Sequence, residues 1–166
     1  MSARRRQPGR DSRRYYDWLD RSSEDLIAAK LLSEDDRCYN LAAFHCQQAI
    51  EKALKAYILL KSNQLVDGHN LMWLCRQAKK YDKGFHQWFD ESADLNQCYI
   101  ETRYPADLEQ EITYKKVRNF YRMAKEMYTY IFEEIDREFD RRERAEELAS
   151  RQSLPALPRP RTDKTE

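Results

Sequence analysis

The stretch that most constrains the fold runs from Cys38 to Lys61 and reads CYNLAAFHCQQAIEKALKAYILLK. It contains no Gly or Pro, and its apolar and polar side chains separate at the 3.6-residue period of an α-helix. The centre of the apolar face is made mostly of Ala and Cys, so neighbouring helices can approach it closely. The expected core positions on this face are Ala42, Cys46, Ala49, Ala53 and Tyr57. The pattern predicts a central bundle helix of roughly six turns.

Four further amphipathic segments indicate an all-α chain. Gly and Pro are rare, with three Gly and five Pro in 166 residues. Apolar residues recur at three- and four-residue steps over 14–34, 70–81, 85–103 and a long segment that begins between 108 and 113. Because the connections are short, successive helices should be antiparallel neighbours. We therefore predict one domain, an up-and-down antiparallel bundle of about five helices.

The two ends of the chain differ in composition from the expected bundle, which we place at 15–140. Residues 1–14 carry six Arg and no large apolar side chain except the initiator Met, which predicts a disordered basic arm. Such an arm is either a solvated tail or a segment that contacts the phosphates of a nucleic acid. Residues 141–166 lose the apolar stripe and contain three Pro, which predicts a charged helix end and a disordered tail.

Charge and cysteine usage narrow the classes of function. Charged residues make up 36% of the chain but nearly cancel to +1, so any basic surface must be local. The four cysteines, with the three histidines, show no pairs at metal-ligand spacing, so we expect free thiols and no metal site. No apolar run of about twenty residues occurs, and the N-terminus is too polar for a signal peptide. We expect a cytoplasmic protein that does not enter a membrane.

Three motifs resemble those of the HEPN domain family, whose members are small helical bundles. AAFHCQQAIEKALKAYI (42–58) is similar to the family's signature helix. HNLMWLCRQA (69–78) is similar to the His-Asp-Leu start of its third helix, with Asn70 in place of the acidic residue, and YIETRYP (99–105) resembles its Arg-Tyr-Pro junction. The motifs occur in the family's order, and the resemblance spans about Tyr16 to Phe132.

The helix period and the resemblance together place His45, Gln48, Lys52 and Arg103 as one candidate ligand pocket beside the central helix. Lys52 and Arg103 would supply positive charge, Arg103 as a planar fork suited to phosphate oxygens. His45 and Gln48 would orient the ligand by hydrogen bonds. In the structural alternative these polar residues are hydrogen-bonded at a packed helix flank, and Arg103 pairs with a carboxylate such as Glu51.

Some HEPN proteins are metal-independent ribonucleases that use an Arg followed a few residues later by a His near the start of the last helix. In this chain His45, His69 and His86 all precede that helix, and Arg103 is followed by YPADLE. The obvious general acid-base catalyst for attack by a ribose 2′-hydroxyl is therefore missing.

The resemblance implies a non-catalytic homodimer that binds a nucleotide, RNA or another polyanion and acts with a minimal nucleotidyltransferase subunit, as in a toxin–antitoxin pair. The alternative is a ribonuclease toxin with a non-standard site such as His45 with Arg103. No catalytic residue and no cofactor is assigned, since the P-loop, Gly-rich dinucleotide turn, HExxH and GxSxG motifs are all missing from the sequence.

Overall fold

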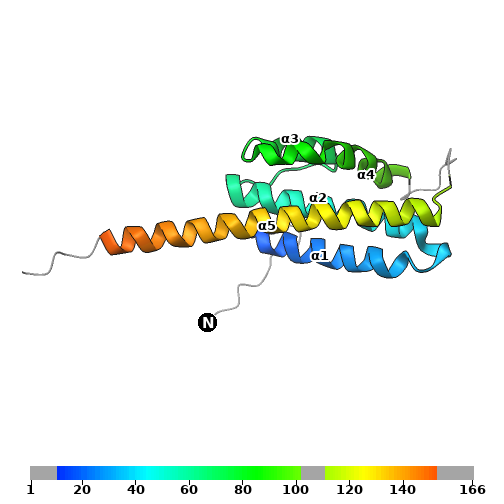
Figure 1. Cartoon of the computed structure of the whole chain (residues 1–166), viewed down its shortest axis with the longest axis horizontal. Helices are drawn as coiled ribbons and strands as arrows, with labels where there is room; N and C mark the ends of the chain where they lie inside the picture. The colour runs from blue at the N-terminus through cyan, green and yellow to red at the C-terminus, as the bar shows by residue number, and fades with distance from the viewer. Residues whose placement is uncertain (1–10, 102–110, 153–166) are drawn as a thin grey trace, which may run out of the picture. The chain divides into compact units, whose positions relative to one another are not determined.

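The computed structural model describes residues 11–101 and 111–152, and every regular element within them is helical. The α-helices are α1 (Tyr15–Leu32), α2 (Tyr39–Ser62), α3 (Leu71–Lys79), α4 (Phe89–Glu101) and α5 (Tyr114–Gln152) (Figure 1). Two short 3₁₀ helices, η1 (Asp36–Cys38) and η2 (Lys83–Trp88), precede α2 and α4. The predicted all-α, five-helix antiparallel bundle is confirmed. The described helices include none that is both long and apolar enough to cross a lipid bilayer.

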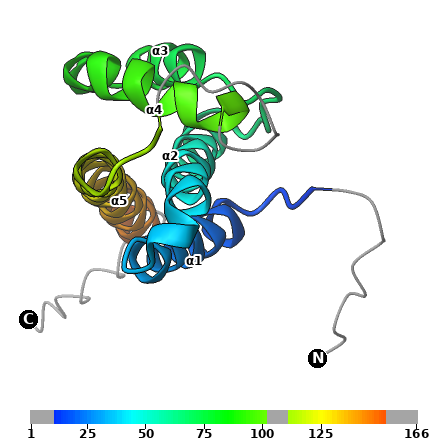
Figure 2. The same ribbon diagram turned by 90° about the vertical axis from the view of Figure 1, so that its right-hand side faces the viewer.

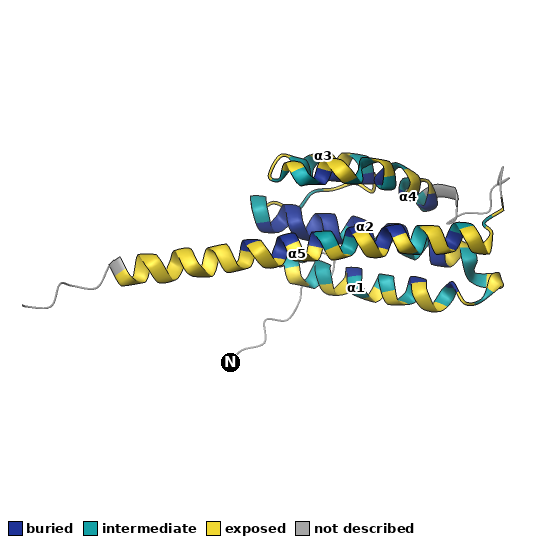
Figure 3. Cartoon of the chain, in the orientation of Figure 1, coloured by how far each residue is buried: buried dark blue, intermediate teal, exposed yellow. Residues whose placement is uncertain are grey.

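The chain divides after Ile135 into two compact units, and the first of them holds the bundle. Figure 2 shows α2 between α1 on one side and α3 with α4 on the other, and the first part of α5 beside α1 and α2. Fifteen of the 24 residues of α2 are buried, which makes it the centre of the unit (Figure 3). Ala42, Cys46, Ala49 and Ala53 have no exposed surface, and Tyr57 has 2%. The small residues of this face let α1 lie close against it.

A close crossing of α1 and α2 is marked by Ser22 and Ala49, both fully buried. The Ser22 hydroxyl donates a hydrogen bond of 2.6 Å to the carbonyl oxygen of Ala49, so the two backbones approach within reach of one short side chain. A larger side chain at either position has no free space to occupy.

Ala49→Leu should therefore lower the free energy of unfolding by about 1–3 kcal/mol, because overpacking this crossing forces the two helices apart. Thermal unfolding followed by circular dichroism measures the change. Ala145→Leu, at an exposed position of α5, is the matched control and should leave the melting temperature unchanged. Equal melting temperatures for the two variants would contradict the close packing of α1 on α2.

The segment between α3 and α4 differs from the sequence prediction in one respect. We predicted a helix from Phe85 onward, but the chain first makes η2, and α4 begins at Phe89. The Asp82 carboxylate accepts the backbone N–H of Gly84 at 2.8 Å and so starts a tighter 3₁₀ turn. Gly84 also lies under Tyr130, where an added Cβ would collide with the Tyr130 hydroxyl. The local cap and this close approach select the 3₁₀ geometry.

The second unit begins at Asp136 and contains the remaining part of α5, which ends at Gln152. Its residues from Phe139 to Arg151 are exposed, and within it Glu138 forms ion pairs with Arg141 at 3.3 Å and Arg142 at 3.0 Å. The predicted basic arm, 1–14, lies outside the described residues up to residue 10, and the predicted segment 141–166 lies outside them from residue 153 onward.

Candidate functional site

His45 and Lys52 lie on the side of α2 that faces α1, and both bind Asp25. The Asp25 carboxylate lies 2.8 Å from Nδ1 of His45, and its second oxygen pairs with the Lys52 ammonium group. The Asp25 side chain is only 12% exposed. Because residues seven apart on a helix lie on the same side, about two turns from one another, one carboxylate of the neighbouring α1 reaches both side chains of α2. Two of the four residues predicted to hold a ligand are thus bound to an internal carboxylate.

Gln48 does not join this group. Its amide nitrogen donates to Oε1 of Gln47 at 2.8 Å and to Oε2 of Glu51 at 3.3 Å. Gln48 is three residues from His45 and four from Lys52, so it lies between the two flanks of the helix, and its amide turns toward the Glu51 side. Arg103 lies outside the described residues. The described part of the chain therefore brings together His45 and Lys52 of the predicted pocket, but not Gln48.

Glu51 is the centre of a buried polar cluster on the opposite flank. Glu51 is 3% exposed and Lys55 is 6% exposed. The Glu51 carboxylate accepts a hydrogen bond of 2.9 Å from the ammonium group of Lys55. His69 Nδ1 lies 3.0 and 3.1 Å from the two carboxylate oxygens, and Gln47 Nε2 lies 3.2 Å from one of them. Each partner satisfies an acceptor position that would otherwise be buried without a hydrogen bond.

The same cluster holds the segment that leads into α3. Gln47 Nε2 donates to the carbonyl oxygen of His69 at 3.1 Å, and the His69 ring stacks on Tyr99 of α4 with 4.7 Å between ring centroids. The i, i+4 spacing of Glu51 and Lys55 was visible in the sequence, but His69 comes from a loop and could not be placed by helix period. These contacts tie His69, just before α3, to both α2 and α4.

Three of the four cysteines are buried thiols. Burial raises the pKa of the Cys46 thiol to about 12 and that of Cys75 to about 11, and Cys98 is buried as well. Cys38 is partly exposed. Within 11–101 and 111–152, no group of three or more His, Cys, Asp or Glu side chains is arranged to hold a metal ion.

At pH 8 a maleimide should label Cys38 rapidly and leave Cys46 and Cys75 unlabelled. A thiol reacts as its thiolate, and a raised pKa keeps both buried thiols protonated until the pH rises toward 11 or 12. Peptide mapping by mass spectrometry identifies the labelled residue, and Cys38→Ser should remove the rapid phase. Labelling of Cys46 at the rate of Cys38 would show that the α2 face is open to solvent.

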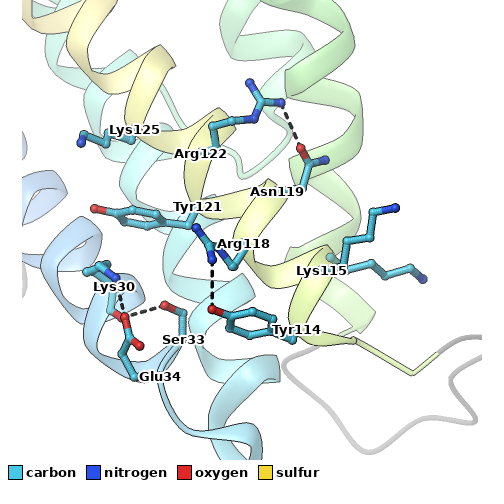
Figure 4. A pocket seen from close by; sticks show the side chains of 11 residues that line it. Lys30, Ser33, Glu34, Tyr114, Lys115, Arg118, Asn119, Tyr121, Arg122 and Lys125 are labelled. Atoms are coloured by element: carbon cyan, nitrogen blue, oxygen red, sulfur yellow. Dashed lines mark hydrogen bonds and ion pairs between the residues drawn. The ribbon is translucent and has the colours of Figure 1, made fainter.

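An open groove of about 880 Å³ lies between α1 and the first turns of α5 (Figure 4). Six of the residues that line it are basic: Lys30, Lys115, Lys116, Arg118, Arg122 and Lys125. Among the described lining residues Glu34 is the only acidic one. A chain with a net charge of +1 thus concentrates positive charge at this place. We call the surface formed by these six basic residues, Glu34, Tyr114 and Tyr121 the basic groove.

Several basic side chains of the groove are held in position by neighbours. Figure 4 shows the Arg118 guanidinium donating to the Tyr114 hydroxyl, at 3.1 Å, and Arg122 donating to the side-chain oxygen of Asn119, at 2.9 Å. On α1, Lys30 pairs with Glu34 one turn further along. The hydrogen bond from Lys30 lowers the pKa of Glu34, and the positive charge of Arg118 across the groove lowers it further. The charge of Arg118 on α5 therefore acts on Glu34 of α1.

The sequence contained part of this site. Lys115, Arg118, Arg122 and Lys125 follow one another in steps of three and four, which puts them on one side of α5. We interpreted this segment only through its apolar stripe, and the basic side was missed. The contribution of Lys30 and Glu34 carries no local signal, because they become neighbours of α5 only when the bundle forms.

The fold and the site define a class of protein: a small α-helical bundle around a small-residue central helix, with a basic groove on its surface. The family model of the HEPN domain matches residues 15–148, so the chain belongs to the HEPN domain family. The resemblance found in the three sequence motifs is thereby confirmed.

The solved structures that are similar to the chain include the following two. The protein TT1696 from Thermus thermophilus has a TM-score of 0.64 and 26% identity, and the match covers 74% of this chain and 98% of that one. ST0689, described as an archaeal HEPN homologue, has a TM-score of 0.59 and 20% identity, with the same shares of 74% and 98%, and shows the same fold. No curated protein matches the chain.

Proposed function

We propose that this chain is a non-catalytic HEPN subunit that binds a polyanion, a nucleotide or RNA, and acts with a minimal nucleotidyltransferase subunit in a toxin–antitoxin pair. The observation that supports it best is the basic groove, with six cationic side chains and one carboxylate around a single hollow. Like charges gathered in this way repel one another, so the arrangement is expected where a bound anion offsets the repulsion.

The geometry favours the basic groove over the pocket first predicted beside α2. His45 and Lys52 are bound to Asp25, and a ligand phosphate would have to compete with that carboxylate. In the groove Lys30 pairs with Glu34 and Arg122 with Glu126, the latter at 2.8 Å. The Arg118 guanidinium, however, donates to a neutral hydroxyl, and a guanidinium can bind phosphate oxygens in a bidentate manner.

The non-catalytic part of the proposal is supported by where the histidines lie. His45 binds Asp25, His69 binds Glu51, and no histidine of the described residues lines the basic groove. The alternative function, a ribonuclease that uses His45 with Arg103, is tested by incubating the purified protein with RNA. Cleavage that is lost in His45→Ala would replace the non-catalytic proposal.

The homodimer is also part of the proposal. Ile27 and Leu31 of α1 and Leu41 of α2 are 59%, 68% and 50% exposed, which leaves apolar surface for a second copy to cover. Light scattering should give twice the mass of one 20.1 kDa chain. A mass of one chain at micromolar concentration would remove the homodimer from the proposal. We expect the neighbouring reading frame to encode a minimal nucleotidyltransferase, and co-purification of its product with this chain tests the partner.

Titration with ATP, GTP and a short labelled RNA tests the binding function. Wild type should bind at least one of them, and Arg118→Glu should weaken that binding by about ten- to hundredfold, because a charge-assisted contact is replaced by repulsion. Arg76→Glu, an exposed position on α3 outside the groove, is the charge-matched control and should bind as wild type does. Equal losses in both variants would show that only the net charge matters.

A further inference from the structure

The basic groove combines a row of cations with two aromatic rings, and this combination fits one kind of polyanion. We infer that the groove binds a single strand of nucleic acid, with its phosphates along α5 and its bases against Tyr114 and Tyr121. The inference rests on the proposed polyanion-binding function and adds the class of ligand, its placement and the groups that would distinguish it from other anions.

The row of cations on α5 is long enough to contact several phosphates of one strand. Lys115 and Lys125 are ten residues apart on α5, which corresponds to about 15 Å along the helix axis. At about 3.4 Å for each stacked nucleotide, such a row extends along about four phosphates of one strand. Arg118 and Arg122 lie between the two ends of the row. The phosphates of a single mononucleotide would contact only part of it.

The two tyrosines provide surfaces on which bases can stack. Both tyrosines line the groove. Tyr114 is 48% exposed, with the Tyr39 ring 6.1 Å away between centroids, and Tyr121 packs partly buried against the core, so Tyr114 offers the more open ring. The two tyrosines are seven residues apart, which places them on the same side of α5, two turns from one another. Each ring already has a cation near it: Arg118 lies 5.4 Å from the Tyr114 ring centroid, and Lys30 lies 5.9 Å from that of Tyr121.

Stacking is what favours a single strand over a duplex. In a duplex the faces of the bases are covered by their neighbours, whereas an unpaired base can lay its face on a tyrosine or an arginine. Positive grooves with interspersed aromatic side chains are the recurring way in which proteins bind single strands without sequence preference. A groove for duplex or for inorganic polyanions needs the cations alone.

Glu34 sets the affinity of the groove from the α1 side. Lys30 lowers its pKa, so the carboxylate stays ionised at neutral pH and repels the phosphates of a strand. Glu34→Gln keeps the size of the side chain and removes the charge. This variant should bind a single strand a few times more tightly than wild type does, which no purely structural role of Glu34 would produce.

Fluorescence anisotropy with a labelled 12-nucleotide RNA, the DNA strand of the same sequence, its duplex, and polyphosphate tests the inference. Tyr114→Leu should weaken binding of both single strands by about tenfold and leave polyphosphate binding unchanged. Tyr114→Phe, which keeps the ring and loses only the hydroxyl that accepts from Arg118, should retain most of the single-strand binding that Tyr114→Leu loses. Melting temperatures check that the variants are folded, and Tyr121→Leu repeats the measurement at the second ring. With four phosphate contacts, log K should fall with log salt with a slope of about −3.

The outcomes separate the inference from the function on which it rests. If polyphosphate and RNA both bind, Arg118→Glu weakens both, and Tyr114→Leu changes neither, the groove is a charge site and the single-strand inference is wrong while the proposed function stands. Tighter binding of duplex than of either strand would overturn it too, as would equal competition by poly-glutamate, which would indicate an acidic protein partner. If none of the anions binds, the proposed function is wrong as well.

Discussion

Glu51→Ala should lower the free energy of unfolding by about 3–5 kcal/mol, because removing one member of a buried ion pair leaves the other charge without a partner. The Lys55 ammonium group is 6% exposed, and the Glu51 carboxylate is its ion-pair partner at 2.9 Å. The substitution also removes the acceptor of His69, which holds the segment before α3. Chemical denaturation of the purified protein measures the change.

Two comparison variants test whether the loss of stability comes from the burial of this ion pair. Glu24→Ala removes a carboxylate whose pair with Arg21 is exposed on both sides, so it should change stability by at most about 1 kcal/mol. The double variant Glu51→Ala with Lys55→Met should recover much of the loss, because no unpaired charge remains buried. If the double variant is as unstable as Glu51→Ala, the lost hydrogen bonds rather than the Lys55 charge explain the effect.

Phe85→Ala should lower the free energy of unfolding by a similar amount, about 3–5 kcal/mol, because it opens a cavity among three elements of the bundle. Phe85 in η2 is fully buried, and its ring centroid lies 4.6 Å from that of Tyr57 in α2 and 5.3 Å from that of Tyr130 in α5. The cavity cannot collapse easily, because each of the three rings comes from a different element.

Phe132→Ala is the matched control for this second prediction, since the Phe132 side chain is 46% exposed. It should cost less than about 1 kcal/mol, as surface substitutions usually do. Denaturant midpoints of the two variants, measured side by side, give the difference. Similar midpoints would mean that the ring of Phe85 is not part of the core that joins η2 to α2 and α5.

The sequence by itself determined the helices and the family. The period of 3.6 residues is a local property of the chain, so the buried face of α2 and the apolar stripe of α5 could be predicted without knowing what covers them. The start of α4 was less well predicted, because the Asp82 cap and the approach of Tyr130 to Gly84 select a 3₁₀ turn first. The end of the central helix was predicted at Lys61, one residue before the observed end at Ser62, after which Asn63 adopts a left-handed conformation.

Only the tertiary structure decided how the polar residues are used. Helix period placed His45 and Lys52 on one flank, but the partner that they share, Asp25, comes from α1 and is recognisable only when the two helices pack. The basic groove likewise requires Lys30 and Glu34 of α1 to face the cations of α5. The reason is physical: a helix repeats its own pattern locally, whereas the pairing of side chains on different helices depends on contacts between residues far apart in the chain.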